Sequence, residues 1–263
     1  MTDRLTDRVA LITGSDSGIG QATAVAFAGE GADVVVTYFE DDKGAKETVR
    51  QVEAAGRRAL LRQLDVTDEA AIESVFDDAL AEFGRIDILV NNASVDSTGK
   101  EVAEMALDAW ERALRTNLTG PMMCCRRFIK ERRRAGGREG GRGKIINITS
   151  VHDEIPRAGA AEYCASKGGL QNLTRTLALE LAPDQINVNN IGPGMVLTPM
   201  NQEALEDPKA REEQVASIPW KRAAEPEEIA RLAVFLASDD ANYVSGSTYY
   251  MDGALMQNQG QGA

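Results

Sequence analysis

The sequence is poor in several residue types from which sites are built. Its 263 residues include one histidine, three cysteines and two tryptophans. No long apolar stretch precedes the first strand-like segment, and none elsewhere approaches the length of a membrane span, so we expect neither a secretory signal nor a transmembrane helix. Cys124, Cys125 and Cys164 are an odd number without metal-site spacing, which suits reduced thiols. We therefore expect a cytoplasmic protein with no disulfide framework and no metal site.

Positive charge is also scarce, because 29 Lys and Arg stand against 41 Asp and Glu, giving a formal net charge of −12. The electrostatic field of this negative charge repels polyanions, so we expect neither nucleic acid nor a membrane surface as a partner. Residues 132–144, RRRAGGREGGRGK, depart from this balance with six basic side chains. An RNA-binding segment is one interpretation. A solvated loop between a helix and a strand is the other, and the acidic surroundings favour it.

The pattern that the sequence does have is a regular alternation of short apolar runs with amphipathic helical segments such as 68–84 and 226–238. This alternation predicts an α/β fold: a doubly wound, seven-stranded parallel sheet of the Rossmann type in three αβα layers, forming a single domain over 1–263. Residues 195–222 interrupt this alternation of strand and helix segments, and we expect them to form a substrate lid. The expected strands are 8–14, 33–38, 58–66, 86–93, 144–150, 186–192 and 247–253.

A glycine-rich turn, TGSDSGIG at residues 13–20, follows the first strand and leads into a helix. Glycines let a backbone approach a pyrophosphate, and a helix N-terminus offers free N–H groups and partial positive charge. The Gly-x-x-x-Gly-x-Gly spacing differs from both G-x-G-x-x-G and the P-loop, and a purely structural turn is the alternative. Asp65, Asn91 and Ala93 end the third and fourth strands, at the edge where open α/β sheets bind ligands.

Tyr163 and Lys167 are four residues apart, so they share one face of a helix. A free phenol has a pKa near 10, but an ammonium about 4 Å away at an effective dielectric of about 20 favours phenolate by roughly three pKa units, with burial opposing it. Tyr163 could then exchange protons near neutral pH. The surrounding stretch 150–167, SVHDEIPRAGAAEYCASK, also contains Ser-x-His-Asp. These residues are too close in sequence for a hydrolase triad, and no G-x-S-x-G elbow accompanies them.

Taken in order, these motifs resemble those of the short-chain dehydrogenase/reductase family. TGSDSGIG matches its T-G-x-x-x-G-x-G, NNAS nearly matches N-N-A-G, and Asn117 matches its helix asparagine. Ser150, Tyr163 and Lys167 match its Ser and Tyr-x-x-x-Lys. Further matches are INVNNIGPGMVLTPM at 186–200 and DGA at 252–254. The resemblance spans nearly the whole chain and implies an NAD(P)-dependent oxidoreductase that transfers hydride between a nicotinamide and a secondary alcohol or ketone.

The resemblance also implies a role for each matched residue. Tyr163 would exchange the proton, Ser150 would hold the substrate oxygen, and Asn117 would help to seat a relay water behind Lys167, which would also bond the nicotinamide ribose. The implied cofactor-binding residues are Gly14, Ser17, Gly18, Ile19, Gly20, Thr37, Tyr38, Asp65, Val66, Asn92, Ala93, Tyr163, Lys167, Pro193, Gly194, Val196 and Thr198.

Two residues depart from the family pattern. Ser94 stands where the family has glycine, so a positive φ there would cost about 1–2 kcal/mol, and its hydroxyl would lie near the ribose or the substrate. Ala254 replaces the second glycine of D-G-G. Neither change removes a reacting group.

The segment VVVTYFEDDKG, which ends the second strand, indicates which nicotinamide binds. It places Thr37 and Phe39 before three acids, the glycine turn adds Asp16, and no arginine is near. An acidic environment disfavours a 2′-phosphate, so we expect NAD, with NADP possible.

The second half resembles the bacterial glucose 1-dehydrogenase group in SVHDEIP, TLALELAP, VNNIGPG and EPEEIA. This implies a sugar or polyol as substrate. Arg157 and Ala158 replace bulkier apolar residues of that group, so the resemblance does not secure glucose itself. The implied substrate contacts are Asp96, Ser150, His152 and Tyr163, with Glu154 and Asn201 as further candidates.

Two other functions stay open. A 3-oxoacyl-[acyl-carrier-protein] reductase shares these catalytic residues and would need a basic docking patch, for which 132–144 is the candidate. A non-catalytic cofactor sensor is the more remote alternative. In this family the helices corresponding to 117–133 and 161–182 pair between subunits, and here they carry apolar residues beyond one stripe, such as Leu173, Leu177 and Leu181. This implies a homotetramer, with a dimer next.

Overall fold

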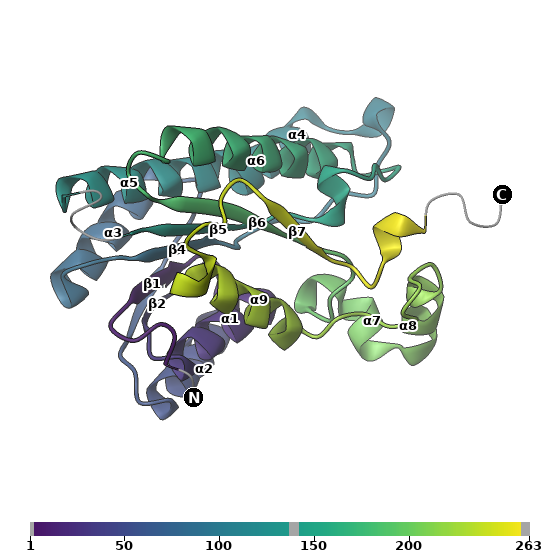
Figure 1. Cartoon of the computed structure of the whole chain (residues 1–263). Coiled ribbons are helices and arrows are strands. Elements are labelled where there is room, and N and C mark those ends of the chain that lie inside the picture. The colour runs from purple at the N-terminus through teal and green to yellow at the C-terminus, as the bar shows by residue number, and fades with distance from the viewer. Residues whose placement is uncertain (1–2, 137–141, 259–263) are drawn as a thin grey trace.

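The computed structural model of the chain describes residues 3–136 and 142–258. A parallel sheet with the strand order β3-β2-β1-β4-β5-β6-β7 lies between two helical layers (Figure 1). The chain builds outward from β1 to β3, then restarts beside β1 at β4, which is the doubly wound arrangement predicted from the sequence. The strands are β1 (Val9–Ile12), β2 (Asp33–Tyr38), β3 (Ala59–Gln63), β4 (Ile88–Asn91), β5 (Lys144–Ile148), β6 (Asn187–Pro193) and β7 (Thr248–Met251).

Helices α1, α2 and α9 cover one face of the sheet, and α3 to α6 cover the other (Figure 1). Each face has its own apolar cluster, one around Phe27 and Ile229 and the other around Phe76 and Phe128. The inner strands β1 and β4 are largely apolar because both of their faces are covered. The helices are α1 (Gly18–Gly29), α2 (Asp42–Ala54), α3 (Glu69–Phe83), α4 (Leu107–Leu114), α5 (Gly120–Arg134), α6 (Ala161–Glu180), α7 (Gln202–Glu206), α8 (Pro208–Val215) and α9 (Pro226–Ala237).

Helix ends follow local chemistry. Asp68 caps α3 by accepting from the Ala70 N–H, and Gly84 ends it at a φ of 76°. The expected helix 117–133 differs, because a π-helical turn over Arg115–Thr119 joins α4 to α5. Leu177 and Leu181, whose apolar character suggested a subunit interface, pack instead into the core under α6, whereas Leu179 is exposed.

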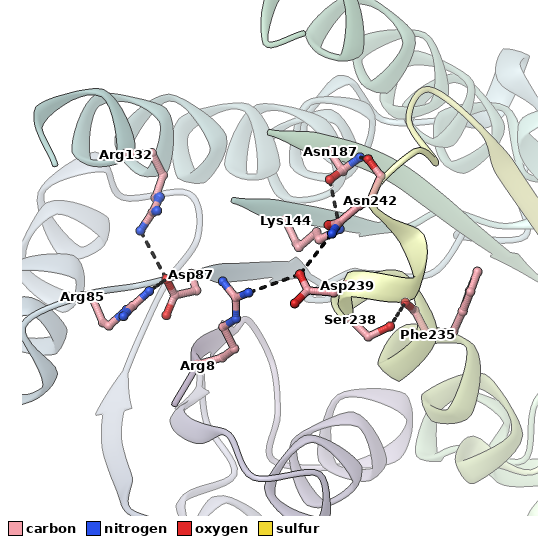
Figure 2. A network of polar contacts seen from close by, with 10 residues as sticks. All are labelled: Arg8, Arg85, Asp87, Arg132, Lys144, Asn187, Phe235, Ser238, Asp239 and Asn242. Atoms are coloured by element: carbon pink, nitrogen blue, oxygen red, sulfur yellow. Dashed lines mark hydrogen bonds and ion pairs between the residues drawn. The ribbon is translucent and has the colours of Figure 1, made fainter. Parts of the chain in front are cut away.

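The amino ends of the strands are tied together by charged and amide side chains (Figure 2). The fully buried Asp87 carboxylate accepts from the Val9 N–H at 3.0 Å and pairs with Arg85 at 2.6 Å and Arg132 at 3.3 Å. Lys144 donates to two asparagine side chains, and burial lowers its pKa to about 8. Buried polar groups satisfied in this way hold the strand register at this edge.

Residues 195–222 contain α7 and α8, which extend beyond the carboxyl ends of the strands (Figure 1). The C-terminal segment is tied to them, because the Trp220 N–H donates to the Gly253 carbonyl and the Asn258 amide donates to the Ser217 carbonyl. Within the described ranges no helix is long and apolar enough to span a bilayer. Of the basic segment 132–144, residues 137–141 lie outside the described residues.

Candidate active site

The carboxyl ends of the strands open into a cavity of about 1170 Å³. Its walls come from the glycine turn after β1, the segments that follow β2 to β6, and the first turns of α6. These are the places where a doubly wound sheet binds its ligands. Among the described residues no three His, Cys, Asp or Glu side chains are placed to hold a metal ion.

The glycine turn fits a pyrophosphate. Gly14 and Gly18 have φ values of 62° and 53°, which glycine adopts without strain. A Cβ on Gly20 would lie 2.2 Å from the Gly14 carbonyl oxygen and 2.5 Å from the Asn92 amide nitrogen, so glycine is required there. Ser17, the N-cap residue of α1, makes no side-chain cap bond, which leaves the first-turn N–H groups of α1 available to an anion.

Most of the predicted cofactor residues line the cavity. Thr198 lies against the glycine turn, 3.1 Å from where a Cβ of Gly18 would be, and so connects the 195–222 segment with it. The lining residues among those predicted are Gly14, Ser17, Gly18, Ile19, Asp65, Val66, Asn92, Ala93, Tyr163, Lys167, Pro193, Gly194, Val196 and Thr198.

Gly20, Thr37 and Tyr38 are not part of the cavity wall. Thr37 is fully buried, accepts from the Gly14 N–H at 3.2 Å and donates to the Ile12 carbonyl at 3.0 Å, so it holds the glycine turn from behind. Tyr38 packs against the apolar cluster beneath α1. Thr37 and Tyr38 thus support the glycine turn and the core, and the part of these three residues in binding the cofactor stays a prediction.

The wall near the end of β2 is acidic instead. Phe39, Glu40 and Asp41 line it together with Asp16 of the glycine turn. Burial raises the pKa of Asp16, and the Asp41 carboxylate raises it further. The sequence contained the signal for this wall, a run of acids directly after a buried strand.

Ser150, Tyr163 and Lys167 converge on the opposite side of the cavity. Ser150 follows β5 and accepts from the His152 N–H at 3.2 Å. Its hydroxyl acts on the Tyr163 phenol, whose pKa it lowers. Lys167 is buried, donates to the Ile148 carbonyl at 3.0 Å, and has its ammonium 5.5 Å from the centre of the Tyr163 ring. The structure thus brings together the three residues that the sequence placed on two elements.

Burial dominates the protonation of this group. It raises the pKa of Tyr163 to about 12 and lowers that of Lys167 to about 8. Lys167 therefore does not bring the Tyr163 phenol close to neutrality here, because desolvation is the largest influence on the pKa of both groups. Tyr163 consequently holds its proton at neutral pH.

The Asp153 carboxylate lies behind this pair. The Tyr250 hydroxyl donates to this carboxylate at 2.7 Å. The negative charge of Asp153 raises the pKa of both Lys167 and Tyr163. Burial raises the pKa of Asp153 itself. No local sequence pattern indicates this role of Asp153, because its partner Tyr250 lies 97 residues away along the chain.

Asn117 occupies the π-helical turn and makes all its side-chain hydrogen bonds to protein. Its oxygen accepts from the Val95 N–H at 2.8 Å and from the Ser94 hydroxyl at 3.1 Å, and its nitrogen donates to the Val95 carbonyl and the Ser166 hydroxyl. It thus braces the segment after β4 against α6, and its part in a water relay stays a prediction.

The two departures from the family pattern differ in their consequences. Ser94 does not have a positive φ, so the cost that such a backbone would carry does not arise. Its hydroxyl donates to the Asn117 side chain at the cavity wall, and its place near the ribose or the substrate stays a prediction. Ala254 has a φ of 68°, in the left-handed region that disfavours a side chain.

His152 lines the cavity beside Tyr163, with the two rings edge to face and their centres 6.3 Å apart. Its Nδ1 lies 3.0 Å from the Ile155 carbonyl oxygen, which only accepts, so Nδ1 carries the proton and neutral His152 presents Nε2 as an acceptor. Asp153 bonds Tyr250 rather than His152, which confirms that no hydrolase triad forms.

The remaining substrate candidates divide between the cavity and the surface. Asp96 and Asn201 line the cavity. Glu154 does not, because it accepts from Gln171 at 2.8 Å and pairs with Arg175 at 3.6 Å. Its contact with the substrate stays a prediction.

The fold and this cavity define a nucleotide-binding oxidoreductase, and comparisons with known proteins agree. A family model described as enoyl-(acyl carrier protein) reductase matches residues 14–255. 3β-Hydroxysteroid dehydrogenase 1 of Eggerthella lenta is 41% identical over 97% of this chain and 96% of its own. Glucose 1-dehydrogenase 2 of Bacillus subtilis is 37% identical over 95% of each chain. The crystal structure of acetoin dehydrogenase from Enterobacter cloacae is 36% identical, with a TM-score of 0.85 and coverage of 98% of this chain and 99% of that one.

The chain belongs to the short-chain dehydrogenase/reductase family and is an NAD(P)-dependent oxidoreductase. This confirms the resemblance predicted from its motifs, including the likeness to bacterial glucose 1-dehydrogenase.

Proposed function

We propose that the protein interconverts a secondary alcohol and a ketone on a sugar, a polyol or a related hydroxylated compound, with NAD as its cofactor. The observation that carries this proposal is that one continuous cavity is lined both by the glycine turn and by the hydroxyl-bearing residues Ser150 and Tyr163. The names of the relatives support it, since one is a glucose dehydrogenase and one an acetoin dehydrogenase.

The residues present divide the chemistry among them. The glycine turn would hold the pyrophosphate of the dinucleotide, and residues 193–198 would hold its nicotinamide, which when bound would supply or accept hydride. In ketone reduction Tyr163 donates its proton to the substrate oxygen, which Ser150 holds by a hydrogen bond, and in alcohol oxidation the same proton returns to Tyr163. The Lys167 ammonium stabilises the phenolate left on Tyr163. Because Tyr163 holds its proton at neutral pH, reduction is favoured near pH 7 and oxidation at alkaline pH.

The acidic wall supports NAD over NADP. Asp16, Glu40 and Asp41 would lie nearest to a 2′-phosphate. The parts of the cavity wall formed by residues 14–19 and 39–41 include no lysine or arginine. Repulsion by these carboxylates disfavours the phosphate dianion. A solved structure from Agrobacterium tumefaciens, 32% identical with a TM-score of 0.87, contains bound NADP, so both nucleotides belong in the test.

An acyl-carrier substrate is less well supported. The described ends of the basic segment, residues 132–136 and 142–144, end α5 and lead into the start of β5 at the amino edge of the sheet, whereas the cavity opens at the carboxyl edge. Arg132, Arg133 and Arg134 are engaged by Asp87, Asp184 and Glu131, respectively. A carrier docked there would present its thioester on the wrong side of the sheet.

Three further expectations belong to this proposal. A homotetramer is implied by the family, and the exposed Leu179 on α6 is consistent with a subunit contact there. A cytoplasmic location is consistent with three free cysteines, of which Cys124 and Cys125 are buried. We also propose that residues 195–222 act as a substrate lid.

The test is reduced-nucleotide formation with NAD or NADP across a panel of sugars, polyols and hydroxy acids, run beside reduction of an acetoacetyl thioester. The proposal expects turnover of a hydroxylated compound with a preference for NAD. Turnover of the thioester alone would support the acyl-carrier alternative, and nucleotide binding with no turnover on any compound would support the sensor.

A further inference from the structure

Two arginines that line the cavity are without partners. Arg112 on α4 and Arg157 in the segment before α6 both form part of its wall, and neither makes an ion pair or a side-chain hydrogen bond to any residue that the structure describes. Many guanidinium groups in the described part of this acidic chain are paired, as where Arg127 contacts three carboxylates. Arg112 and Arg157 are exposed to solvent at the cavity wall, where an unpaired guanidinium group is free to bind an anion.

Arg157 belongs to the substrate end of the cavity. Its segment connects His152 to Tyr163, and its backbone carbonyl accepts from the Ala160 N–H at 3.2 Å just before α6 begins. Gly159, with a φ of 76°, packs so closely on Gly99 that a Cβ would lie 2.8 Å from its carbonyl oxygen. The Arg157 segment is therefore held against the loop that carries the predicted substrate residue Asp96.

The side chains at the substrate end of the cavity favour two kinds of substrate group. Asp96 and the free Nε2 of His152 accept hydrogen bonds, as hydroxyl groups of a substrate require. Arg157 donates through a planar fork that matches a carboxylate. A neutral sugar would leave Arg157 unused, and a phosphate dianion would be repelled by Asp96 more strongly than a carboxylate.

We infer that the substrate is a polyhydroxy carboxylic acid, with its carboxylate paired to Arg157 and its reacting carbinol at Tyr163. This inference rests on the proposed function and narrows its substrate class. In oxidation the carbinol carbon loses hydride to the nicotinamide, its hydroxyl proton passes to Tyr163, and the carboxylate is unchanged, so the product is an oxo acid. Arg112 adds a second positive charge to the same cavity.

The experiment compares six-carbon aldonates, beginning with gluconate, with the matching neutral aldoses and alditols and with sugar phosphates, all with NAD. The variants are Arg157→Gln and Arg157→Lys, with Arg50→Gln as the matched control, because Arg50 lies on the surface of α2 in an ion pair with Glu47. We expect an aldonate to have the highest kcat/KM. Arg157→Gln should lower this value about tenfold to hundredfold, mainly through KM.

Arg157→Lys should recover part of the loss, and turnover of a neutral alditol should change less than about twofold in either variant, since no charged contact is removed. Arg50→Gln should leave all substrates unaffected. Better turnover of neutral sugars or of sugar phosphates, or an equal effect of Arg157→Gln on charged and neutral substrates, would overturn the inference and leave the oxidoreductase proposal standing. No turnover of any hydroxylated compound would instead contradict the proposed function.

Discussion

Replacing Gly20 with alanine tests the glycine turn. The added Cβ would lie 2.2 Å from the Gly14 carbonyl oxygen, 2.5 Å from the Asn92 amide nitrogen and 2.9 Å from the Ser15 Cα. Two of these neighbours are backbone, so the turn itself must move by about 1 Å to reach ordinary contact distance. Overpacking of this kind costs about 1–3 kcal/mol.

Gly29, on the same helix, provides the matched control. A Cβ there meets nothing within 4 Å. Gly29→Ala should therefore stabilise the protein by up to about 1 kcal/mol, because alanine is the better helix former. Gly20→Ala should lower the melting temperature by roughly 2–8 °C.

The assays are thermal unfolding and fluorescence titration with NADH. Because the Gly14 carbonyl and the N-terminus of α1 shape the pyrophosphate site, Gly20→Ala should weaken NADH binding at least about tenfold, a loss of roughly 1.4 kcal/mol. Gly29→Ala should leave NADH affinity unchanged. If the two variants melted alike and bound NADH alike, the role assigned to the glycine turn would be refuted.

Three further changes give independent tests. Asp153→Asn removes a negative charge that raises the pKa of both Lys167 and Tyr163. Both limbs of the pH profile of kcat/KM should therefore move to lower pH. A profile that stays in place would contradict this electrostatic role. Ala254→Gly relieves a φ of 68° and should stabilise the fold by about 1 kcal/mol in denaturant titration, whereas a loss of stability would show that the residue is unstrained. Asp87→Ala removes a buried carboxylate paired to two arginines and should cost about 3 kcal/mol of unfolding free energy, with a cost below about 1 kcal/mol arguing that the network is unimportant.

The fold could be predicted from the sequence because the apolar patterns that specify its strands and helices are local and periodic. Strands such as β1 and β4 are buried on both faces and read as continuous apolar runs, and the helices between them alternate regularly. The π-helical turn at Arg115–Thr119 was not predicted, since no residue type marks a single widened turn.

Part of the site could not be read from the sequence, because side-chain direction depends on distant residues. Thr37 turns to the glycine turn because its hydroxyl satisfies Gly14, and Glu154 turns outward because Gln171 and Arg175 hold it there.

The most direct test of the central claim is steady-state turnover by Tyr163→Phe with NAD and the substrate found by the panel. The account predicts a fall in kcat of at least about a hundredfold, because the proton donor and acceptor is gone, while NADH binding and the melting temperature stay close to those of the unaltered protein. A variant that kept more than about a tenth of the original kcat would contradict the assignment of proton transfer to Tyr163.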